Sequence, residues 1–199
     1  MSVSDVAGQI LLRLQGAAPA CGATRVIAID GRSGSGKSTL AQAIAAQLGG
    51  VIVGLEDLYG GWDGLEHGVS LLMSAVLRPF SEGRSASVPR YDWLAQAWAL
   101  PRTLEPPPLL LIEGAGAGAR ALAGHTNVLV WLELGAEDRR DRALGRVYGE
   151  LYGPHWQRWA LQEDAFYERE APRERADLVI DAAQTAAEQP CPEWWSQPC

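Results

Sequence analysis

Cysteine is scarce in this sequence of 199 residues, and its cysteines form no metal-binding pattern. Cys21, Cys191 and Cys199 are widely spaced, whereas structural zinc sites use cysteine or histidine pairs a few residues apart. Cys191 and Cys199 lie close enough in the chain to pair, but an odd set of three is more typical of free thiols in a reducing compartment. The expected localisation is therefore cytoplasmic.

Long apolar runs and basic blocks are also missing. No run approaches the roughly 20 apolar residues of a membrane span. Residues 1–15 lack the basic start of a signal peptide and include Arg13, so they predict an amphipathic first helix. The net charge of −7, without a basic block, argues against non-specific binding to nucleic acid. We therefore expect neither a membrane nor a nucleic acid as a partner.

One motif stands out among the residues that are present. Residues 31–39 read GRSGSGKST and match the phosphate-loop pattern G-x-x-x-x-G-K-[ST]. A short apolar run (25–30) precedes the motif and an alanine-rich helical pattern (38–48) follows it, which is the strand, turn and helix order that a phosphate loop needs. The motif predicts that the chain binds a nucleoside triphosphate, and the alternative is a glycine-rich turn without a ligand.

Each residue of the loop has an expected role. Backbone N–H groups would surround the phosphates at the positive end of the following helix. Lys37 would neutralise β- and γ-phosphate oxygens, and the Ser38 hydroxyl would ligate Mg²⁺. The predicted nucleotide-binding residues of the loop are Gly31, Ser33, Gly34, Ser35, Gly36, Lys37, Ser38 and Thr39.

Apolar runs alternate with helical stretches along the chain, which is typical of an α/β fold with a parallel sheet. The expected strands are residues 25–30, 51–55, 109–112, 128–134 and 178–180. We expect a five-stranded parallel sheet with helices on both faces, the three-layer phosphate-loop NTPase fold, as a single domain over residues 1–199. Residues 58–105 would be an acceptor-binding insertion, and residues 136–170 a helical lid of two helices around a mobile segment that breaks at Gly153 and Pro154.

Carboxylates follow two of these strands. Glu56 and Asp57 come after the second strand, where a carboxylate could accept the proton of a hydroxyl that attacks the γ-phosphate. A shift of one residue in register decides which of them points inward, so both are candidates; the alternative is a solvated acidic turn. Glu113 ends the apolar run LLLIE and resembles a Walker-B acid, which holds Mg²⁺ or orients the nucleophile.

Arginines and aromatic residues complete the pattern. Arg139, Arg142 and Arg146 share one face of a predicted helix and suit phosphate contacts, although neighbouring acids also allow an ordinary salt-bridged surface helix. The insertion carries aromatic residues, acids and arginines that suit a small ring-bearing acceptor. Within it we expect Trp98 to be a core residue and His67 a surface residue.

The whole pattern resembles the uridine kinase group of phosphate-loop kinases. The family's elements stand here, in the family's order, as GRSGSGKS, EDLY, RYDW, LLLIEG and RRDRALGR, over roughly residues 25–181. The stretch EDLYGGWDGL is also similar to actinobacterial uridine-kinase-like proteins. The resemblance implies that Glu56 occupies the position of the catalytic aspartate, that Asp63 lies near the ribose-binding acid, and that Tyr91 contacts the nucleoside. It also implies that Arg139, Arg142 and Arg146 form a lid helix that meets phosphates and substrate.

Two positions depart from the family. Glutamate replaces aspartate at residue 56, which keeps Asp57 open as the base, and Gln96 stands where the family has a base-contacting histidine. We expect an enzyme that uses ATP and Mg²⁺ to phosphorylate a hydroxyl of a nucleoside or similar small metabolite. The expected catalytic residues are Lys37, Glu56 or Asp57, and Arg142. The expected substrate-side residues are Tyr59, Asp63, Arg90, Tyr91, Gln96 and Glu113.

Two other functions stay open as alternatives. A switch or motor ATPase or GTPase would act on a protein partner, but the sequence has neither an LSGGQ-like signature nor an N/T-K-x-D guanine-recognition motif. A nucleotide-binding regulator without catalysis is the other alternative. A homodimer is also left open.

Overall fold

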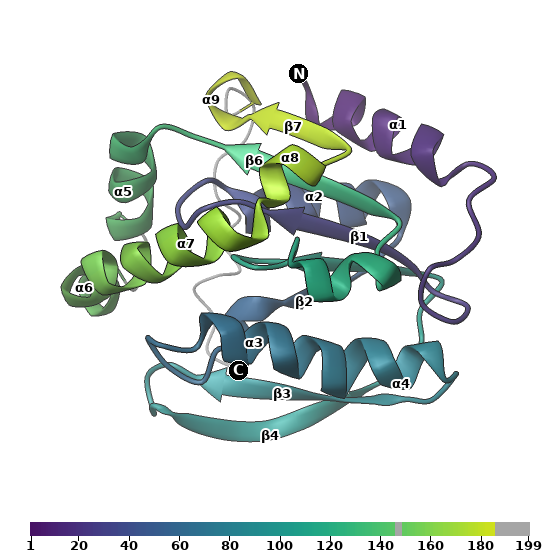
Figure 1. Ribbon diagram of the computed structural model, residues 1–199, viewed down its shortest axis with the longest axis horizontal. Coiled ribbons are helices and arrows are strands. Elements are labelled where there is room, and N and C mark those ends of the chain that lie inside the picture. Colours follow the sequence, from purple (N-terminus) through teal and green to yellow (C-terminus); the bar gives the residue numbers. More distant parts are fainter. Residues whose placement is uncertain (146–148, 186–199) are drawn as a thin grey trace.

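A parallel five-stranded sheet forms the centre of the molecule in the computed structural model, which describes residues 1–145 and 149–185. Its strand order is β2-β5-β1-β6-β7 (Figure 1). The strands are β1 (Arg25–Asp30), β2 (Val51–Gly54), β5 (Leu109–Glu113), β6 (Val128–Glu133) and β7 (Leu178–Asp181). All five strands predicted from the sequence are present, and the three-layer phosphate-loop NTPase fold class is confirmed.

Both faces of the sheet are covered, which explains why its strands are apolar without alternation. On β1, Ile27 and Ile29 belong to the core on one face and Val26 and Ala28 to the core on the other. All four side chains are fully buried. The central strand β1 pairs with β5 on one side and β6 on the other, so its carboxyl end lies between the carboxyl ends of these two strands.

Helices α1 (Val3–Leu14) and α2 (Lys37–Leu48) cover one face. Ser2 begins α1 with a capping box in which its side chain and that of Asp5 each accept a backbone N–H. Gly36 precedes α2 in the left-handed conformation, and Gly49 ends it in the same conformation. The phosphate loop thus runs directly from β1 into the first turn of α2.

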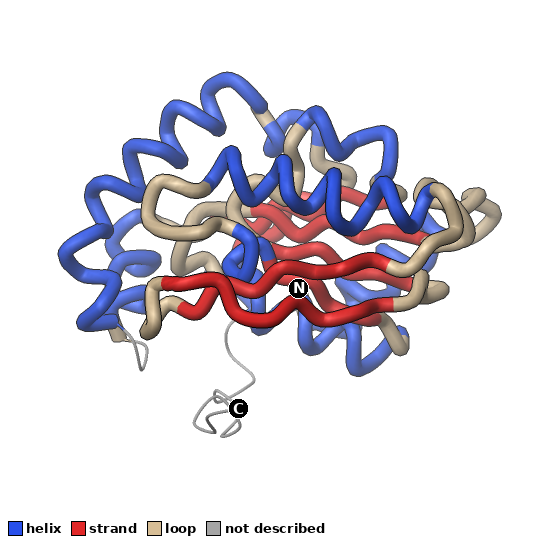
Figure 2. The backbone as a smooth tube through the Cα atoms, turned by 90° about the horizontal axis from the view of Figure 1, so that it is seen from below, coloured by secondary structure: helices blue, strands red, loops and turns tan. Residues whose placement is uncertain are grey.

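The opposite face carries a helical segment that begins after β2. Its elements are η1 (Leu55–Leu58), α3 (Leu65–Leu71), the π-helical η2 (Leu72–Leu77) and α4 (Arg78–Ser81). An antiparallel ribbon of β3 (Ala86–Asp92) and β4 (Ala97–Leu104) follows, separate from the main sheet. Figure 2 shows this ribbon from below, alongside the helical segment.

The ribbon corrects one expectation. Trp98 was predicted to be a core residue because of its apolar surroundings in the sequence, but it is 46% exposed on β4. Nearly all of β4 is exposed, since β3 contributes Ala86 and Val88 to the core and β4 lies outside it. A half-exposed strand can be as apolar as a buried one, so composition misled here.

The C-terminal part of the chain adds several further helices to the sheet. They are η3 (Arg120–His125), α5 (Ala136–Leu144), α6 (Gly149–Tyr152), η4 (Gly153–His155), α7 (Trp156–Glu170), α8 (Pro172–Arg175) and α9 (Ala182–Thr185). The predicted break at Gly153 and Pro154 takes the form of the 3₁₀ turn η4, from which α7 continues directly. Arg146, Cys191 and Cys199 lie outside the described residues.

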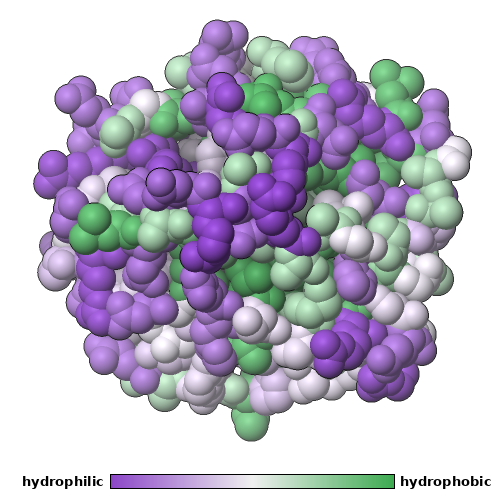
Figure 3. All heavy atoms as spheres, in the orientation of Figure 1, coloured by the Kyte–Doolittle hydropathy of each residue, from purple (hydrophilic) through white to green (hydrophobic). Residues whose placement is uncertain are grey.

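In the described ranges, no helix combines the length and apolar character that crossing a membrane requires. Polar side chains cover much of the face over α7 and α8 in Figure 3.

Candidate functional site: the phosphate loop and the acids that face it

The phosphate loop has the backbone conformation that its glycines allow. Gly34 and Gly36 have φ angles of 83° and 100°, a region that side chains rarely adopt. A Cβ on Gly34 would also collide with the backbone of Arg139, so α5 packs directly on the loop. The sequence pattern therefore encodes both the curvature of the loop and its contact with α5.

Lys37 and Ser38 lie where the motif predicts. Lys37 is 8% exposed, and its Nζ donates to the carbonyl of Arg32 at 3.1 Å. The Ser38 Oγ donates to both carboxylate oxygens of Glu113, at 3.1 and 3.2 Å. Ser38 and Glu113 are 75 positions apart in the sequence. They meet in the fold because β5, which ends at Glu113, pairs with β1, which leads into the phosphate loop.

These residues fit Mg²⁺ and a polyphosphate. A hydroxyl and a carboxylate are oxygen ligands of the kind that Mg²⁺ accepts, with the remaining positions left for water and phosphate. The described residues include no cluster of three or more His, Cys, Asp or Glu side chains arranged to hold a metal. A Cβ at Gly36 would meet nothing closer than 3.8 Å, and no side chain caps the first turn of α2. The N-terminus of α2, the end of a helix that favours anions, lies at this end of the loop.

The remaining loop residues differ in exposure. Ser35 is fully buried, and its Oγ has no hydrogen-bond partner among the described residues. Thr39 is exposed on α2. The backbone N–H of Gly31 donates to Asp30 and that of Ser33 to Glu163. The predicted loop residues are thus together, but the amides of Gly31, Ser33 and Ser35 have protein partners, the last being the carbonyl of Arg32.

Glu56 and Asp57 of η1 differ in burial and in the charges around them. Burial raises the pKa of Asp57, and the charges of Arg90 and Arg102 oppose that increase. Glu56 is exposed, and its negative charge is one of those that raise the pKa of Tyr59. Asp57 is therefore the partly buried carboxyl group of the two and is influenced by the ribbon arginines, whereas Glu56 is exposed on η1.

Tyr59 belongs to the core of this region. It is 6% exposed, and its hydroxyl donates to the carbonyl of Ala115 at 2.9 Å. Its ring packs on that of Trp159 with centroids 4.7 Å apart. Burial first, and then the charges of Glu113 and Glu56, hold the pKa of Tyr59 well above its ordinary value. Tyr59, predicted to be a substrate residue, is therefore a buried core residue in the structure.

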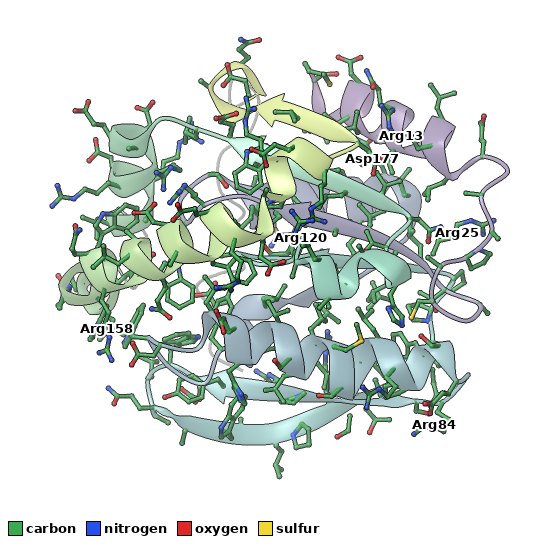
Figure 4. The ribbon with its side chains drawn as sticks, in the orientation of Figure 1. Arg13, Arg25, Arg84, Arg120, Arg158 and Asp177 are labelled. Carbon is green, nitrogen blue, oxygen red and sulfur yellow. The ribbon has the colours of Figure 1, made fainter. Side chains whose placement is uncertain are left out.

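The loop before α3 contacts α7 and the turn that precedes it. Trp62 stacks on Tyr152 and His155, with centroid distances of 5.3 and 4.5 Å. Asp63 forms a two-pronged ion pair with Arg158, and Figure 4 shows Arg158 near the beginning of α7, beside this loop. Asp63, predicted to lie near a substrate ribose, is therefore engaged by α7.

The ribbon residues lie near the same loop. The Tyr91 ring makes edge contacts with Trp93 and Trp98 at 5.2 and 5.3 Å. Gln96 has a positive φ of 50° and occupies the exposed turn of the hairpin. Tyr91 therefore packs with the neighbouring ribbon tryptophans, and Gln96 lies at the tip of the hairpin.

The arginines of α5 contact the phosphate loop. Arg139 donates to the carbonyls of Leu134 and Ser33 at 3.1 and 3.3 Å. Burial lowers the pKa of Arg139, against the opposing charge of Glu163. A terminal nitrogen of Arg142 lies 3.9 Å from the position that a Cβ on Gly36 would take. Arg139 and Arg142 thus lie beside the loop, and their predicted contacts with phosphate stay a prediction.

Three residues of this region were missed by the sequence analysis. Asp30 is fully buried and accepts from the N–H groups of Gly31, Gly116 and Gly118 and from the hydroxyl of Tyr167. Burial raises the pKa of Asp30, and these hydrogen bonds oppose the increase. Asp30 ends the strand before the motif, which was a usable signal. Glu163 and Tyr167 lie in an ordinary helical pattern that gave none.

Two cavities lie close to these elements. One, of about 370 Å³, lies between the phosphate loop, α5 and α7, and its lining includes Arg32, Arg139 and Trp156. The other, of about 240 Å³, is lined mainly by small side chains together with Arg175 and Asp177. The first adjoins the loop, whereas the second contains none of the candidate catalytic residues.

No protein-family model matches the chain, and no curated protein matches it. Among solved structures, a "possible uridine kinase" from Bacillus stearothermophilus is 22% identical, with a TM-score of 0.66 over 90% of this chain and 97% of its own. A candidate fructose transport system kinase from Silicibacter sp. TM1040 is 21% identical, with a TM-score of 0.60 over 90% of this chain and 99% of its own. The chain has the three-layer α/β fold of these phosphate-loop kinases.

Proposed function

We propose that this protein is an ATP- and Mg²⁺-dependent phosphotransferase that moves the γ-phosphoryl group to a hydroxyl of a small metabolite, with nucleosides as the first class to test. The observation that carries the proposal is the contact of Ser38 with both oxygens of Glu113, beside Lys37. That arrangement joins a phosphate-binding lysine to a pair of Mg²⁺ ligands.

Each group has a defined task in this proposal. The amides at the start of α2 bind phosphate oxygens, and Lys37 balances charge on the β- and γ-phosphates. Ser38 and Glu113 hold Mg²⁺, which, when bound, neutralises the phosphate oxygens. Arg142 extends from α5 toward the same space and stabilises charge on the transferred group.

Glu56 is the proposed general base. Its side chain is exposed on η1, whereas Asp57 is partly buried and the charges of Arg90 and Arg102 act on it. A base must reach the proton of the acceptor hydroxyl while that hydroxyl faces the γ-phosphate. Glu56 satisfies this requirement better than Asp57, which we assign to the support of the ribbon.

The acceptor would bind between the ribbon and the loop before α3. Tyr91, Trp93 and Trp62 supply ring surfaces there, and aromatic surfaces suit a ring-bearing acceptor. The helices of residues 149–170 would act as the lid that excludes water, which otherwise competes with the acceptor for the phosphoryl group. Loss of that exclusion would appear as ATP hydrolysis.

The test is a screen for ADP release with nucleosides, sugars and vitamin precursors as acceptors. We expect turnover only with an acceptor, and its loss in Lys37→Ala. Glu56→Gln should lower kcat by roughly 100-fold or more, whereas Asp57→Asn, the matched change one residue away, should lower it less than about tenfold. Hydrolysis that no acceptor stimulates would contradict the proposal, and equal losses in the two variants would contradict the choice of base.

A further inference from the structure

Glu163 of α7 is a buried carboxylate that contacts the phosphate loop and has no role in the mechanism above. It is 1% exposed. Its Oε1 accepts from the backbone N–H of Ser33 at 2.7 Å and from the indole N–H of Trp159 at 3.1 Å. A buried carboxylate with specific donors in a ligand-binding loop is a candidate for a functional role.

The contact acts on the peptide group between Arg32 and Ser33. The described chain contains no cis peptide bond, so the C=O of Arg32 and the N–H of Ser33 belong to one trans plane and point in opposite directions. Glu163 holds the N–H end at 2.7 Å, and Lys37 Nζ donates to the C=O end at 3.1 Å. The orientation of this single peptide plane therefore links Glu163 to Lys37.

Neighbouring contacts fix Glu163 in turn. Trp159, one helical turn earlier, donates to it and packs its ring on Tyr59. Arg139 donates to the carbonyl of Ser33 from the side of α5. The Glu163 carboxylate thus contacts Trp159 within α7, on the side of Tyr59, and it contacts the phosphate loop at Ser33.

We propose that Glu163 is a positioning residue for phosphoryl transfer, which orients Lys37 through the peptide group of Arg32 and Ser33. The proposal rests on the proposed function only for its kinetic consequence. In structural terms, α7, which contacts the loop of Trp62 and Asp63, also sets the orientation of the Lys37 side chain.

The sequence offers a direct measurement, because Lys37 is the only lysine in the chain. Protein that carries lysine labelled with ¹³C at the ε carbon gives one side-chain NMR signal, which reports Lys37 alone. We expect Glu163→Ala to shift this signal and Glu163→Gln to restore it, because the Gln oxygen can accept from both Ser33 and Trp159. Asp164→Ala is the matched control, since the exposed Asp164 pairs only with the side chain of Arg32 in the structure.

Measurements of kcat and KM provide a second test of the role of Glu163. In Glu163→Ala, kcat should fall by roughly tenfold to 100-fold, the usual effect of a small misplacement, while KM for ATP changes less than about threefold. Glu163→Gln should recover most of kcat, and Asp164→Ala should retain it. If no acceptor supports turnover, the proposed function fails, and the NMR signal still decides the role of Glu163.

An unchanged Lys37 signal in folded Glu163→Ala would overturn the proposal. So would a signal that Asp164→Ala shifts as much. Should Glu163→Ala not fold, Glu163→Asp takes its place, because the carboxylate then falls one methylene short of the Ser33 amide. A shifted Lys37 signal in that variant supports the proposal, and an unchanged one overturns it.

Discussion

Asp57 is a half-buried carboxyl group that faces two arginines, and its ionisation predicts a pH dependence of stability. Burial raises its folded-state pKa above the ordinary value of 3.8, so the folded state favours the protonated form. The stabilisation that follows is complete below about pH 3.8 and is lost as the pH rises through the raised folded-state pKa. Asp57→Asn has no such ionisation. We therefore expect the difference in free energy of unfolding, parent minus variant, to fall as the pH rises across that window.

Urea unfolding at a series of pH values above 4 measures this difference. Arg102→Gln provides the matched background, because the Arg102 charge lowers the pKa of Asp57. In that background the decline should move to higher pH. A difference that grows as the pH rises would mean that the arginines outweigh burial.

Asp30 shows what single residues in a sequence cannot reveal. Its position at the end of the strand before the motif could be read directly, and so could the adjacent glycine. Its partners Gly116, Gly118 and Tyr167 are 86, 88 and 137 residues away. Only the pairing of β1 with β5 and the docking of α7 bring them together. Ser38 and Glu113 were each accessible from the sequence, Ser38 from the phosphate-loop motif and Glu113 from the apolar run LLLIE that it ends.

At the scale of elements, the five strands of the main sheet were predictable because buried parallel strands are continuously apolar and glycines or acids bound them. The ribbon of β3 and β4 was not, because its outer strand is exposed although WLAQAWAL is largely apolar. The contact between α7 and the loop before α3 was also missed. It depends on Trp62 and Asp63 meeting residues about 90 positions away.

The contact between α7 and the loop before α3 predicts how the proposed lid, residues 149–170, is held closed. Trp62→Ala removes the ring on which Tyr152 and His155 stack, and each aromatic pair is worth about 0.5–1.5 kcal/mol. We expect amide hydrogens in residues 156–170 to exchange roughly tenfold faster, since local opening becomes easier by about that free energy. Hydrogen exchange followed by mass spectrometry measures this, with α2 as the internal reference.

Trp98→Ala is the control for this variant. It removes the same side chain from the exposed strand β4, where the ring contacts Tyr91 and His67 and lies against Gly60. Exchange in residues 156–170 should stay at the parent rate. Equal acceleration in both variants would show that loss of any tryptophan loosens the molecule and that Trp62 does not hold the lid.

For the whole molecule, the net charge of −7 and the acids around the phosphate loop predict that ATP binds tightly only together with a cation. Glu113, Glu56, Asp30 and Glu163 all lie close enough to Tyr59 for their charges to raise its pKa, and an unaccompanied polyphosphate would be repelled by them. We expect a non-hydrolysable ATP analogue to stabilise the fold strongly only with Mg²⁺. At a ligand concentration 100 times Kd the gain is about 2.7 kcal/mol.

Thermal unfolding with and without the analogue, in Mg²⁺ or in a chelator, measures this gain. Ser38→Ala and Glu113→Gln each remove one proposed Mg²⁺ ligand, so each should lose most of the difference between Mg²⁺ and chelator. Ser70→Ala removes a serine hydroxyl that donates only to the carbonyl of Glu66 on an exposed face of α3, and it should keep the full difference. If Glu113→Gln also kept it, the acid at the end of β5 would serve the acceptor and not the metal, and the site would have to find its second Mg²⁺ ligand elsewhere along the carboxyl edge of the sheet.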